Sequence, residues 1–228
     1  MTPRLCLHYA PDNASLCVRL ALEELGLPYD TQLVDRKTYA QRTPAYLAMN
    51  PNGLIPVLET PHGPMFETAA ILLWLADTQQ GLFPVPQDPA RAHALQWMIW
   101  LSNTLHPTLR MMFYPKKYTH GDIPAFRDFT RQMVREKLTL LNAATNADWL
   151  DADTPSIMGC YLGPMLRWAL LYGETLDPGE LSHWPRLQNF ARRTENRPAT
   201  ARAADAEGLG PTPFSAPHPC KPAEGSAV

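Results

Sequence analysis

The chain has 228 residues, of which 45% are hydrophobic and 18% are charged, and its 20 basic and 22 acidic residues give a net charge of −2. This composition supports one large core or two smaller ones, so a wholly disordered chain is excluded. Because the charges nearly balance, no overall field exists to gather a polyanion, and we expect no nucleic-acid partner.

The lengths of the apolar runs and the spacing of the cysteines indicate the cellular compartment of the protein. The longest uninterrupted apolar run, Ala69 to Ala76, is far shorter than the roughly 18 to 20 residues of a membrane-spanning helix, so we expect no membrane partner. The first ten residues lack the apolar block of a secretory signal. The four cysteines, at positions 6, 17, 160 and 220, form no CxxC pair, which argues against a structural zinc site. We therefore expect a cytoplasmic protein with reduced thiols.

The first 35 residues show a strand, a helix and a second strand. We expect the first strand from Arg4 to Tyr9 and the helix from Ser15 to Leu25, with Gly26 ending the helix. The second strand is expected from Tyr29 to Val34. A helix of this length between two strands predicts a parallel βαβ unit.

The next segments complete a small sheet. A short helix is expected from Pro44 to Met49 and a turn from Asn50 to Gly53. A strand from Leu54 to Glu59 and a hairpin partner from Pro64 to Phe66 follow, and an apolar helix is expected from Glu67 to Ala76. The order βαβ, α, ββα over residues 1–78 predicts a thioredoxin-like domain.

After residue 78 the pattern changes. Residues 79–88, which contain two closely spaced prolines, are expected to be a linker, and residues 89–207 an all-helical domain. Helical patterns run over residues 89–113, 123–145, 156–172 and 184–193. The proline-rich residues 208–228 are expected to form an extended tail on the surface. The predicted fold class is thus an α/β thioredoxin-like N-terminal domain plus an all-α C-terminal domain.

Two neighbouring features of the first domain could form a binding site. An X–Pro bond adopts the cis form at low cost, and a cis Ile55–Pro56 bond would turn the backbone of Ile55 outward to pair with an extended peptide. A trans proline that starts a hairpin is the alternative. The helix that begins at Glu67 and Thr68 would bring a carboxylate and a hydroxyl beside this edge, as a site for an amino-acid zwitterion. A simple helix cap at Thr68 is the alternative.

Several stretches in this order resemble the glutathione transferase family, and the resemblance covers nearly the whole chain. They are Tyr9-Ala10-Pro11, Ala21-Leu22-Glu23-Glu24-Leu25-Gly26, Asn50-Pro51-Asn52-Gly53-Leu54-Ile55-Pro56-Val57-Leu58 and Phe66-Glu67-Thr68-Ala69-Ala70-Ile71-Leu72. The resemblance implies that Pro56 is cis and that the backbone of Ile55, beside Leu54, binds the cysteinyl part of glutathione. It also implies that Glu67 and Thr68 hold the γ-glutamyl end.

The residue that ionises the glutathione thiol is less clearly marked. Bacterial members that open with Tyr-x-Pro often carry cysteine at the position of Ala14, so the resemblance implies no mixed disulfide there. Ser15, at the start of the first helix, is our first candidate for the hydrogen-bond donor, since a helix amino terminus also favours an anion. Tyr9 and Asn13 are the alternatives. Neither a metal nor a redox cofactor is implied.

In the helical domain, the stretch Thr104-Leu105-His106-Pro107 resembles one in which related bacterial enzymes direct a histidine toward the glutathione cleft. We therefore include His106 among the candidate glutathione-binding residues, with a surface or core histidine as the alternative. The aromatic residues around it could wall an apolar pocket for a second substrate, although helix packing explains them equally well. They are Trp97, Trp100, Phe113 and Tyr114.

A second departure from the family lies at Ser156-Ile157-Met158-Gly159. The family usually places an aspartate three residues after the serine or threonine, which forms a capping box. Gly159 stands at this position, so the reciprocal hydrogen bond is lost and glycine itself destabilises a helix by about 1 kcal/mol. We predict that Gly159→Asp stabilises the protein.

The resemblance implies a homodimeric glutathione transferase that joins the glutathione thiolate to a small apolar electrophile in detoxification. Two other activities remain open at this point. A glutathione-dependent isomerase or peroxidase would use the same thiolate on another acceptor. A non-catalytic glutathione-binding scaffold gains support from Ala14 and Gly159, where catalytic and structural residues of the family are replaced.

Overall fold

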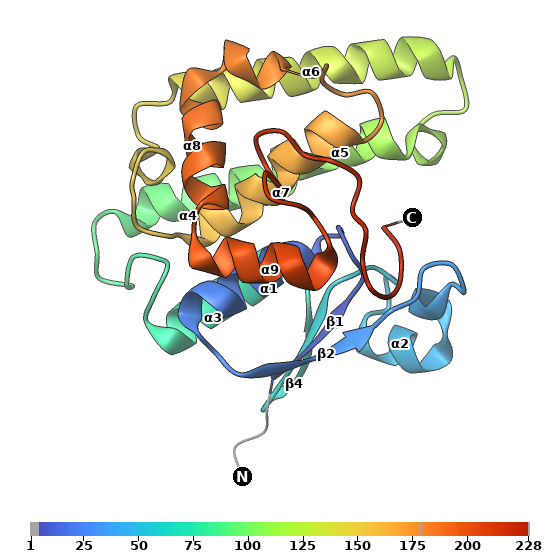
Figure 1. Cartoon of the computed structure of the whole chain (residues 1–228), viewed down its shortest axis with the longest axis vertical. Helices are drawn as coiled ribbons and strands as arrows, with labels where there is room; N and C mark the ends of the chain where they lie inside the picture. Colours follow the sequence, from blue (N-terminus) through green and yellow to red (C-terminus); the bar gives the residue numbers. More distant parts are fainter. Residues whose placement is uncertain (1–4, 178, 228) are drawn as a thin grey trace.

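A computed structural model describes residues 5–177 and 179–227 (Figure 1). The expected start of the first strand at Arg4 lies outside the described residues. The strands are β1 (Leu5–Tyr9), β2 (Tyr29–Leu33), β3 (Val57–Thr60) and β4 (Gly63–Phe66). The helices between them are α1 (Ser15–Leu25), η1 (Ala40–Arg42) and α2 (Pro44–Met49), and α3 (Thr68–Gln79) follows β4.

The four strands form one mixed sheet in the order β2-β1-β3-β4. β1 is parallel to β2 and antiparallel to β3, and β3 and β4 form an antiparallel hairpin, so the predicted βαβ and ββα units are confirmed. Because strand neighbours alternate between faces, Leu58 joins the core shared with α1 and α3, whereas Val57 packs with Tyr46 of α2. The thioredoxin-like fold of the N-terminal part is thereby confirmed.

The segment before β3 differs from the expected strand. β3 begins at Val57, after Pro56, because proline lacks the N–H that a sheet ladder requires. The carbonyl of Leu54 instead accepts hydrogen bonds from the Tyr46 hydroxyl at 2.8 Å and from Asn50 Nδ2 at 2.7 Å. Residues 54–56 therefore lie outside the sheet and are held by side chains.

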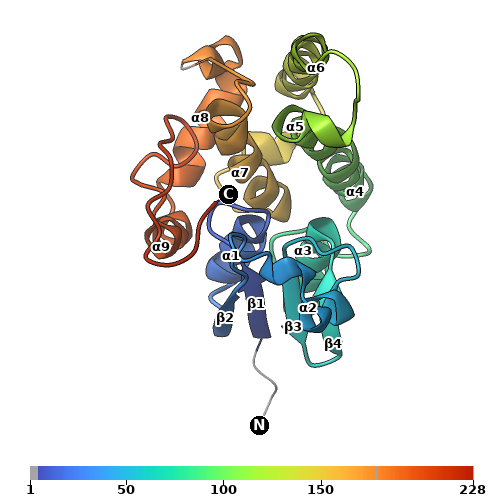
Figure 2. The ribbon, with the colours of Figure 1, turned by 90° about the vertical axis from the view of Figure 1, so that its right-hand side faces the viewer.

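The C-terminal part is helical and packs against α1 and α3 (Figure 2). Its long helices are α4 (Arg91–Trp100), α5 (His106–Phe113), α6 (Ile123–Ala143), α7 (Ile157–Leu171), α8 (Pro185–Glu195) and α9 (Pro198–Glu207). Its short turns are η2 (Leu101–Leu105), η3 (Pro115–Lys117), η4 (Asp148–Leu150) and η5 (Glu180–His183). No helix among the described residues has the length and apolarity needed to cross a membrane.

The expected helix over residues 89–113 contains one turn of π-helix, η2, between α4 and α5. Pro107 lies at the start of α5 and has no N–H to donate to the preceding turn, which accounts for the altered hydrogen bonding there. The hydroxyl of Thr108 donates to the carbonyl of Thr104 at 2.7 Å. This wider turn immediately precedes His106 and so sets the direction in which the helix presents it.

Beyond α9, the chain runs back toward the amino end of α1 (Figure 1). This tail is extended, as its prolines predict, but it is more firmly attached than we expected of a surface segment. Phe214 is completely buried and its ring would lie only 3.1 Å from a Cβ atom at Gly163 of α7. The amide of Lys221 donates to the carbonyl of Gly208 at 2.8 Å. The tail is therefore part of the packed structure.

Candidate functional site

A cavity of about 310 Å³ lies between the two parts of the chain. It is lined from the N-terminal part by Asp12, Asn13, Ala14, Arg36, Gln41, Arg42, Gly53, Leu54 and Ile55, and from the C-terminal part by His106, Arg110, Phe113, Tyr114, Lys117, Arg127, Trp168, Tyr172, Gly173 and Ala227. Four residues that the sequence indicated for the site, Asn13, Leu54, Ile55 and His106, are thus brought together.

Ile55 forms the sheet-side edge of this cavity. The Ile55–Pro56 peptide bond is cis, as the resemblance implied. Within the part of the chain that the structure describes, neither the N–H nor the C=O of Ile55 has a hydrogen-bond partner. The Leu54 carbonyl is already bonded twice, so Ile55 is the backbone group that remains available to an extended ligand.

Glu67 and Thr68 lie at the amino end of α3 and do not line the cavity itself. Glu67 is exposed and adopts φ 72°, an uncommon conformation for a residue with a side chain. Thr68 is buried at 6% exposure. The first amides of α3 have no partner within the helix and lie beside these two side chains. The pair is therefore placed to bind an end of a ligand that extends beyond the cavity.

Ser15 has a structural role in this geometry. Its side chain is completely buried, its hydroxyl donates to the Ala10 carbonyl at 3.1 Å, and it accepts from the Ala10 amide at 3.3 Å. Both hydrogen bonds tie the loop after β1 to the start of α1. Because Ser15 does not line the cavity, its hydroxyl is not presented to a ligand there.

Asn13 is the polar residue at the amino end of α1 that does reach the cavity. Its Nδ2 donates to the Pro11 carbonyl at 2.8 Å and to the Ala227 carbonyl at 3.2 Å, and its Oδ1 accepts from Arg36 at 3.1 Å. Arg36 also donates to the Ala227 carbonyl. A carbonyl oxygen of the tail therefore lies where two donors converge beside the start of a helix.

Tyr9, the other alternative to Ser15, is directed toward the tail. Its ring is buried and its hydroxyl donates to Glu224 at 2.6 Å. Burial raises the pKa of this hydroxyl, and Glu224 raises it further. Tyr9 does not line the cavity, so its hydroxyl serves to hold the C-terminal segment in place.

His106 borders the cavity from the helical side. Its Nδ1 lies 2.9 Å from the hydroxyl of Tyr161, and its ring packs against Trp168 with ring centres 5.7 Å apart. Burial lowers the pKa of His106 to about 4, and the nearby Arg110 lowers it as well. The imidazole is therefore neutral at pH 7 and acts as a hydrogen-bonding group rather than as a cation.

A buried charged cluster lies behind the cavity, and no short sequence pattern indicates it. Asp12 is 4% exposed and accepts from Arg167 at 2.8 Å, from the indole of Trp168 at 2.9 Å and from the hydroxyl of Tyr172. The Asp12 amide donates to Glu207 of α9 at 2.8 Å. These partners are at least 155 residues from Asp12, so no local pattern could have revealed them.

The expected aromatic wall is only half present. Phe113 and Tyr114 line the cavity, whereas Trp97 is buried in the helical core, where its ring packs against that of Trp100 at 5.3 Å. Besides these aromatic residues, the helical side of the cavity carries three basic residues. They are Arg110, Lys117 and Arg127.

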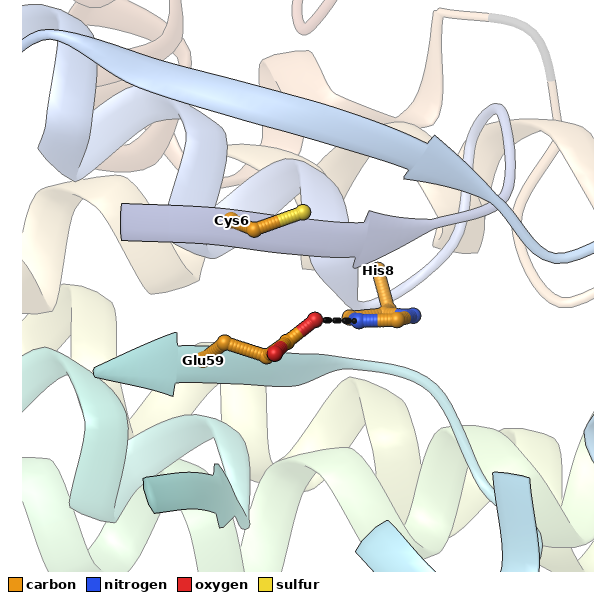
Figure 3. Close-up of side chains that lie close together, drawn as sticks. All are labelled: Cys6, His8 and Glu59. Atoms are coloured by element: carbon orange, nitrogen blue, oxygen red, sulfur yellow. Dashed lines mark hydrogen bonds and ion pairs between the residues drawn. The ribbon is translucent and has the colours of Figure 1, made fainter. Parts of the chain in front are cut away.

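Figure 3 shows a separate cluster on the sheet, formed by Cys6 and His8 of β1 and Glu59 of β3. Their potential ligand atoms lie within 4.8 Å of one another. His8 and Glu59 are already bonded to each other at 2.6 Å. Burial raises the pKa of the Cys6 thiol, with Glu59 and Asp30 adding to the effect, so the thiol is protonated at neutral pH. The cluster is explained as a hydrogen-bonded pair beside a partly buried thiol.

Comparison with known proteins identifies the relatives of this chain. The family described as "Glutathione S-transferase, N-terminal domain" matches residues 14–78. "Glutathione S-transferase GST-4.5" of Xanthomonas campestris is 30% identical over 210 residues, which cover 89% of this chain and 98% of the relative. "Disulfide-bond oxidoreductase YfcG" of Escherichia coli is 30% identical over 213 residues, covering 90% and 96%.

Solved structures show the same similarity. A glutathione transferase homologue from Sulfitobacter with bound glutathione superposes with a TM-score of 0.76 at 25% identity, covering 89% of this chain and 97% of the other. A sphingomonad glutathione S-transferase complexed with glutathione has a TM-score of 0.72 at 28% identity, covering 90% and 100%. Both similarities extend across the sheet-bearing and the helical part.

Proposed function

Because the chain belongs to the glutathione transferase family, we propose that its cavity binds glutathione, ionises the thiol and presents it to a small electrophile. The observation that carries the proposal is the unpaired backbone of Ile55, which shares one cavity with Asn13 and the amino end of α1. An extended peptide can therefore bind by its backbone with its sulfur directed at a helix amino terminus.

The binding contacts follow from the groups available. The cysteinyl N–H and C=O of glutathione pair with the C=O and N–H of Ile55 as a strand would. The ammonium of the γ-glutamyl residue binds the carboxylate of Glu67. The α-carboxylate of the same γ-glutamyl residue binds Thr68 and the first amides of α3. Arg42 and Gln41, which line the cavity beside Ile55, bind the glycyl carboxylate and amide. The buried Oε1 of Gln41 has no partner among the described residues, which agrees with a role toward a ligand.

Asn13 replaces Ser15 in our proposal for thiol activation. An unperturbed thiol with a pKa near 8.5 is only about 3% ionised at pH 7, and a shift of two units requires about 2.7 kcal/mol. A hydrogen bond to a charged group contributes about 1.5 to 3 kcal/mol and a helix terminus about 0.3 to 1 kcal/mol. The Asn13 amide and the unpaired N–H groups of Ala14 and Ser15 can therefore supply the shift.

In the transfer step, the sulfur of the thiolate attacks an electrophilic atom of the second substrate and forms a bond to it. The leaving group departs with its electron pair. The neutral imidazole of His106 contributes a hydrogen bond at the helical wall. Binding both reactants in one cavity supplies the proximity that accelerates such a bimolecular reaction.

The test compares Asn13→Ala with Ser15→Ala, which change neighbouring residues with opposite roles. Asn13→Ala should lower kcat/KM for conjugation of 1-chloro-2,4-dinitrobenzene by about 30-fold to 100-fold and raise the pKa of bound glutathione, measured from the ultraviolet absorbance of the thiolate. Ser15→Ala should lower the midpoint of thermal unfolding and leave that pKa unchanged.

The opposite pattern, a raised thiol pKa in Ser15→Ala only, would return the activating role to Ser15. Binding of glutathione to the wild type without any turnover would favour a non-catalytic scaffold. No binding at millimolar glutathione would refute the proposal as a whole. Isothermal titration with glutathione before the kinetic work separates these outcomes.

A second use of the same thiolate is suggested by the relatives. A disulfide-bond oxidoreductase is as similar to this chain as a glutathione S-transferase, and a maleylacetoacetate isomerase of Rhizobium meliloti is 36% identical over 106 residues. A bound thiolate can attack a disulfide sulfur or add reversibly to a double bond as readily as it displaces a halide. A panel containing all three acceptor types distinguishes transferase, isomerase and reductase activities.

We also propose a homodimer, a cytoplasmic location and a role in detoxification, as the family resemblance implies. Half of the Ile99 side chain on α4 is exposed, and the indole of Trp74 on α3 is only partly buried, so the α3 and α4 surface offers apolar area to a second subunit. Light scattering after size-exclusion chromatography should give twice the monomer mass of 25.6 kDa. Ile99→Asp should reduce that mass if this face forms the interface.

A further inference from the structure

The helical wall of the cavity carries three long basic side chains from consecutive elements. Arg110 lies on α5, Lys117 on η3 and Arg127 on α6, and all three line the cavity. With Arg36 and Arg42 on the opposite side, five basic residues surround a space of about 310 Å³. The whole protein has a charge of −2, so this concentration of positive charge is local.

Many arginines of the helical part pair with carboxylates, whereas these three side chains have no acidic partner among the described residues. Arg131 pairs with Asp128, and Arg135 pairs with Glu180. Among the described residues, no carboxylate pairs with Arg110, Lys117 or Arg127. The Nε of Arg127 is shielded from solvent and has no hydrogen-bond partner there. A buried guanidinium N–H without an acceptor is costly, which points to a ligand that supplies one.

The aromatic ring of Tyr114 holds two of these charges at the cavity. The guanidinium of Arg110 lies 5.5 Å from its ring centre and the ammonium of Lys117 lies 4.8 Å from it. Among the described residues that line the cavity, Asp12 is the one acidic residue, and its carboxylate is bonded to Arg167, Trp168 and Tyr172. The positive potential of the helical wall is therefore not cancelled from within the cavity.

We propose that the second substrate carries a carboxylate, which binds to Arg127, Lys117 and Arg110 while the reactive centre faces the glutathione sulfur. This inference rests on the proposed function and replaces the apolar electrophile of the sequence analysis with an anionic one. A planar guanidinium binds a carboxylate through two parallel hydrogen bonds, and fixed charges in a narrow cavity attract an anion strongly. Arg42, on the sheet side, is left to the glycyl carboxylate of glutathione.

Two classes of second substrate supply such a carboxylate: a small organic acid, and a disulfide that carries carboxylates. With an aryl halide, the thiolate sulfur bonds to the ring carbon and chloride leaves with the bonding electrons. With a disulfide, the thiolate bonds to one sulfur and the other sulfur leaves as a thiolate, so no further oxidant or reductant is needed. Both reactions place the carboxylate of the acceptor on the helical wall.

The experiment uses pairs of acceptors of which one member carries carboxylate and the other is neutral. For the halide, 4-chloro-3-nitrobenzoate is compared with its methyl ester, and for the disulfide, dithiodiglycolate is compared with bis(hydroxyethyl) disulfide. In the wild type, kcat/KM should favour the acid in at least one pair by tenfold or more. Added salt should reduce that preference, since the attraction is between charges.

Arg127→Gln should reduce at least tenfold the ratio of kcat/KM for the acid to kcat/KM for its neutral partner. Arg131→Gln is the matched control, because it removes the same charge from the same helix one turn further on, outside the cavity. This variant should retain the wild-type preference. Preference in the halide pair alone identifies a small acid, and preference in the disulfide pair alone identifies a disulfide substrate.

Titration of each variant with glutathione separates this inference from the proposed function. If the wild type binds glutathione but shows no preference for the acid in either pair, the inference is overturned while the proposed function stands. If Arg127→Gln weakens glutathione binding tenfold, the basic wall serves glutathione and the inference is also overturned. Should neither acceptor pair react, binding of the S-(4-carboxy-2-nitrophenyl) conjugate of glutathione is compared with binding of its methyl ester. Equal affinities would again refute the role of the carboxylate.

Discussion

The two walls of the cavity recognise ligands by different means. The sheet-side wall offers backbone groups, namely the N–H and C=O of Ile55, which have no partner among the described residues, and the amides at the start of α1. The helical wall offers the ends of long side chains, including those of Arg127 and Lys117. Backbone groups are fixed by the fold, whereas a side-chain wall changes with each substitution. The sheet-side wall therefore suits the constant substrate, and the helical wall suits the variable one.

The largest effect on stability is expected at the buried ion pair of Asp12 and Arg167, which joins the two walls of the cavity. Arg167→Met leaves the buried carboxylate of Asp12 without its cation, which should lower the free energy of unfolding by about 3 to 5 kcal/mol, measured by urea denaturation. The double variant Asp12→Asn with Arg167→Met removes both charges and should recover a large part of this loss. Equal instability of the single and double variants would show that shape, rather than charge, joins the walls.

His106 on the helical wall is expected to make the free energy of unfolding depend on pH. The pKa of His106 is about 4 in the folded chain against its usual 6.5, so the unfolded chain binds more protons between these values. The contribution of His106 to stability is therefore complete above pH 6.5 and is lost as the pH falls toward 4, by at most about 3 kcal/mol. His106→Gln should flatten the dependence of unfolding free energy on pH in this window.

The exposed His120 supplies the control for this measurement. His120→Gln should leave the slope of unfolding free energy against pH unchanged. If His106→Gln and His120→Gln gave the same profile, the environment of His106 would be too open to water to alter its protonation.

The tail provides a smaller test on the sheet-side wall. The Ala227 carbonyl accepts hydrogen bonds from Asn13 and Arg36, so glutathione has to compete with it. Gly225 has φ 73°, and a Cβ atom there would lie 2.6 Å from Leu33, so Gly225→Ala should lift the tail. Releasing about 1 kcal/mol of hydrogen bonding should tighten glutathione binding roughly fivefold, measured by calorimetry.

Gly210→Ala is the matched control for the tail. Gly210 also has a positive φ, 84°, but a Cβ atom there would meet nothing within 4 Å. Gly210→Ala therefore imposes the same backbone strain as Gly225→Ala without a steric clash. An equal change in glutathione affinity in the two variants would mean that tail strain, and not the released donors, alters binding.

The smallest effect is expected within α7. Ser156 caps this helix by accepting from the amide of Gly159 at 3.1 Å, as the sequence predicts. Gly159→Asp should raise the free energy of unfolding by about 1 kcal/mol, because a Cβ atom there fits at 3.4 Å from Phe190 and the carboxylate can complete the capping box. The corresponding shift in Tm is about 2–4 °C.

Gly163, one turn later in α7, is a glycine whose replacement is expected to destabilise the protein. A Cβ atom at Gly163 would lie 3.1 Å from the ring of Phe214, so Gly163→Ala should lower Tm although it improves helix propensity. A rise in Tm in this variant would indicate that Phe214 is loosely held. Replacing each of these two glycines of one helix thus separates local helix propensity from tertiary packing.

The sequence predicts the parts of the molecule that depend on short-range patterns. The fold of the sheet follows from patterns of a few residues, and the cis bond at Pro56 agrees with what the family resemblance implies. The helix α9 was missed because its packing surface is made of small residues rather than a stripe of large apolar ones; they are Ala199, Thr200, Ala203 and Ala204.

The parts that could not be predicted depend on the direction of side chains. Ser15 and Asn13 are two residues apart, and only the structure shows that the serine hydroxyl faces Ala10 while the asparagine reaches the cavity. The helical periodicity of α6 cannot distinguish the unpaired Arg127 from the paired Arg131. The tail has no periodicity, and its attachment depends on the buried ring of Phe214 and on hydrogen bonds to distant residues such as Tyr9.

The buried contacts of Arg19 and Asp12 have a consequence for building chimeric enzymes. Arg19 of α1 is bonded to Glu207 of α9 at 2.8 Å, and the Asp12 carboxylate is bonded to Arg167 at the same distance. Grafting this sheet domain onto the helices of another relative would leave both charges stranded unless equivalents of Glu207 and Arg167 travel with it. Acceptor preference is therefore better exchanged by recombining individual wall residues than by swapping whole domains.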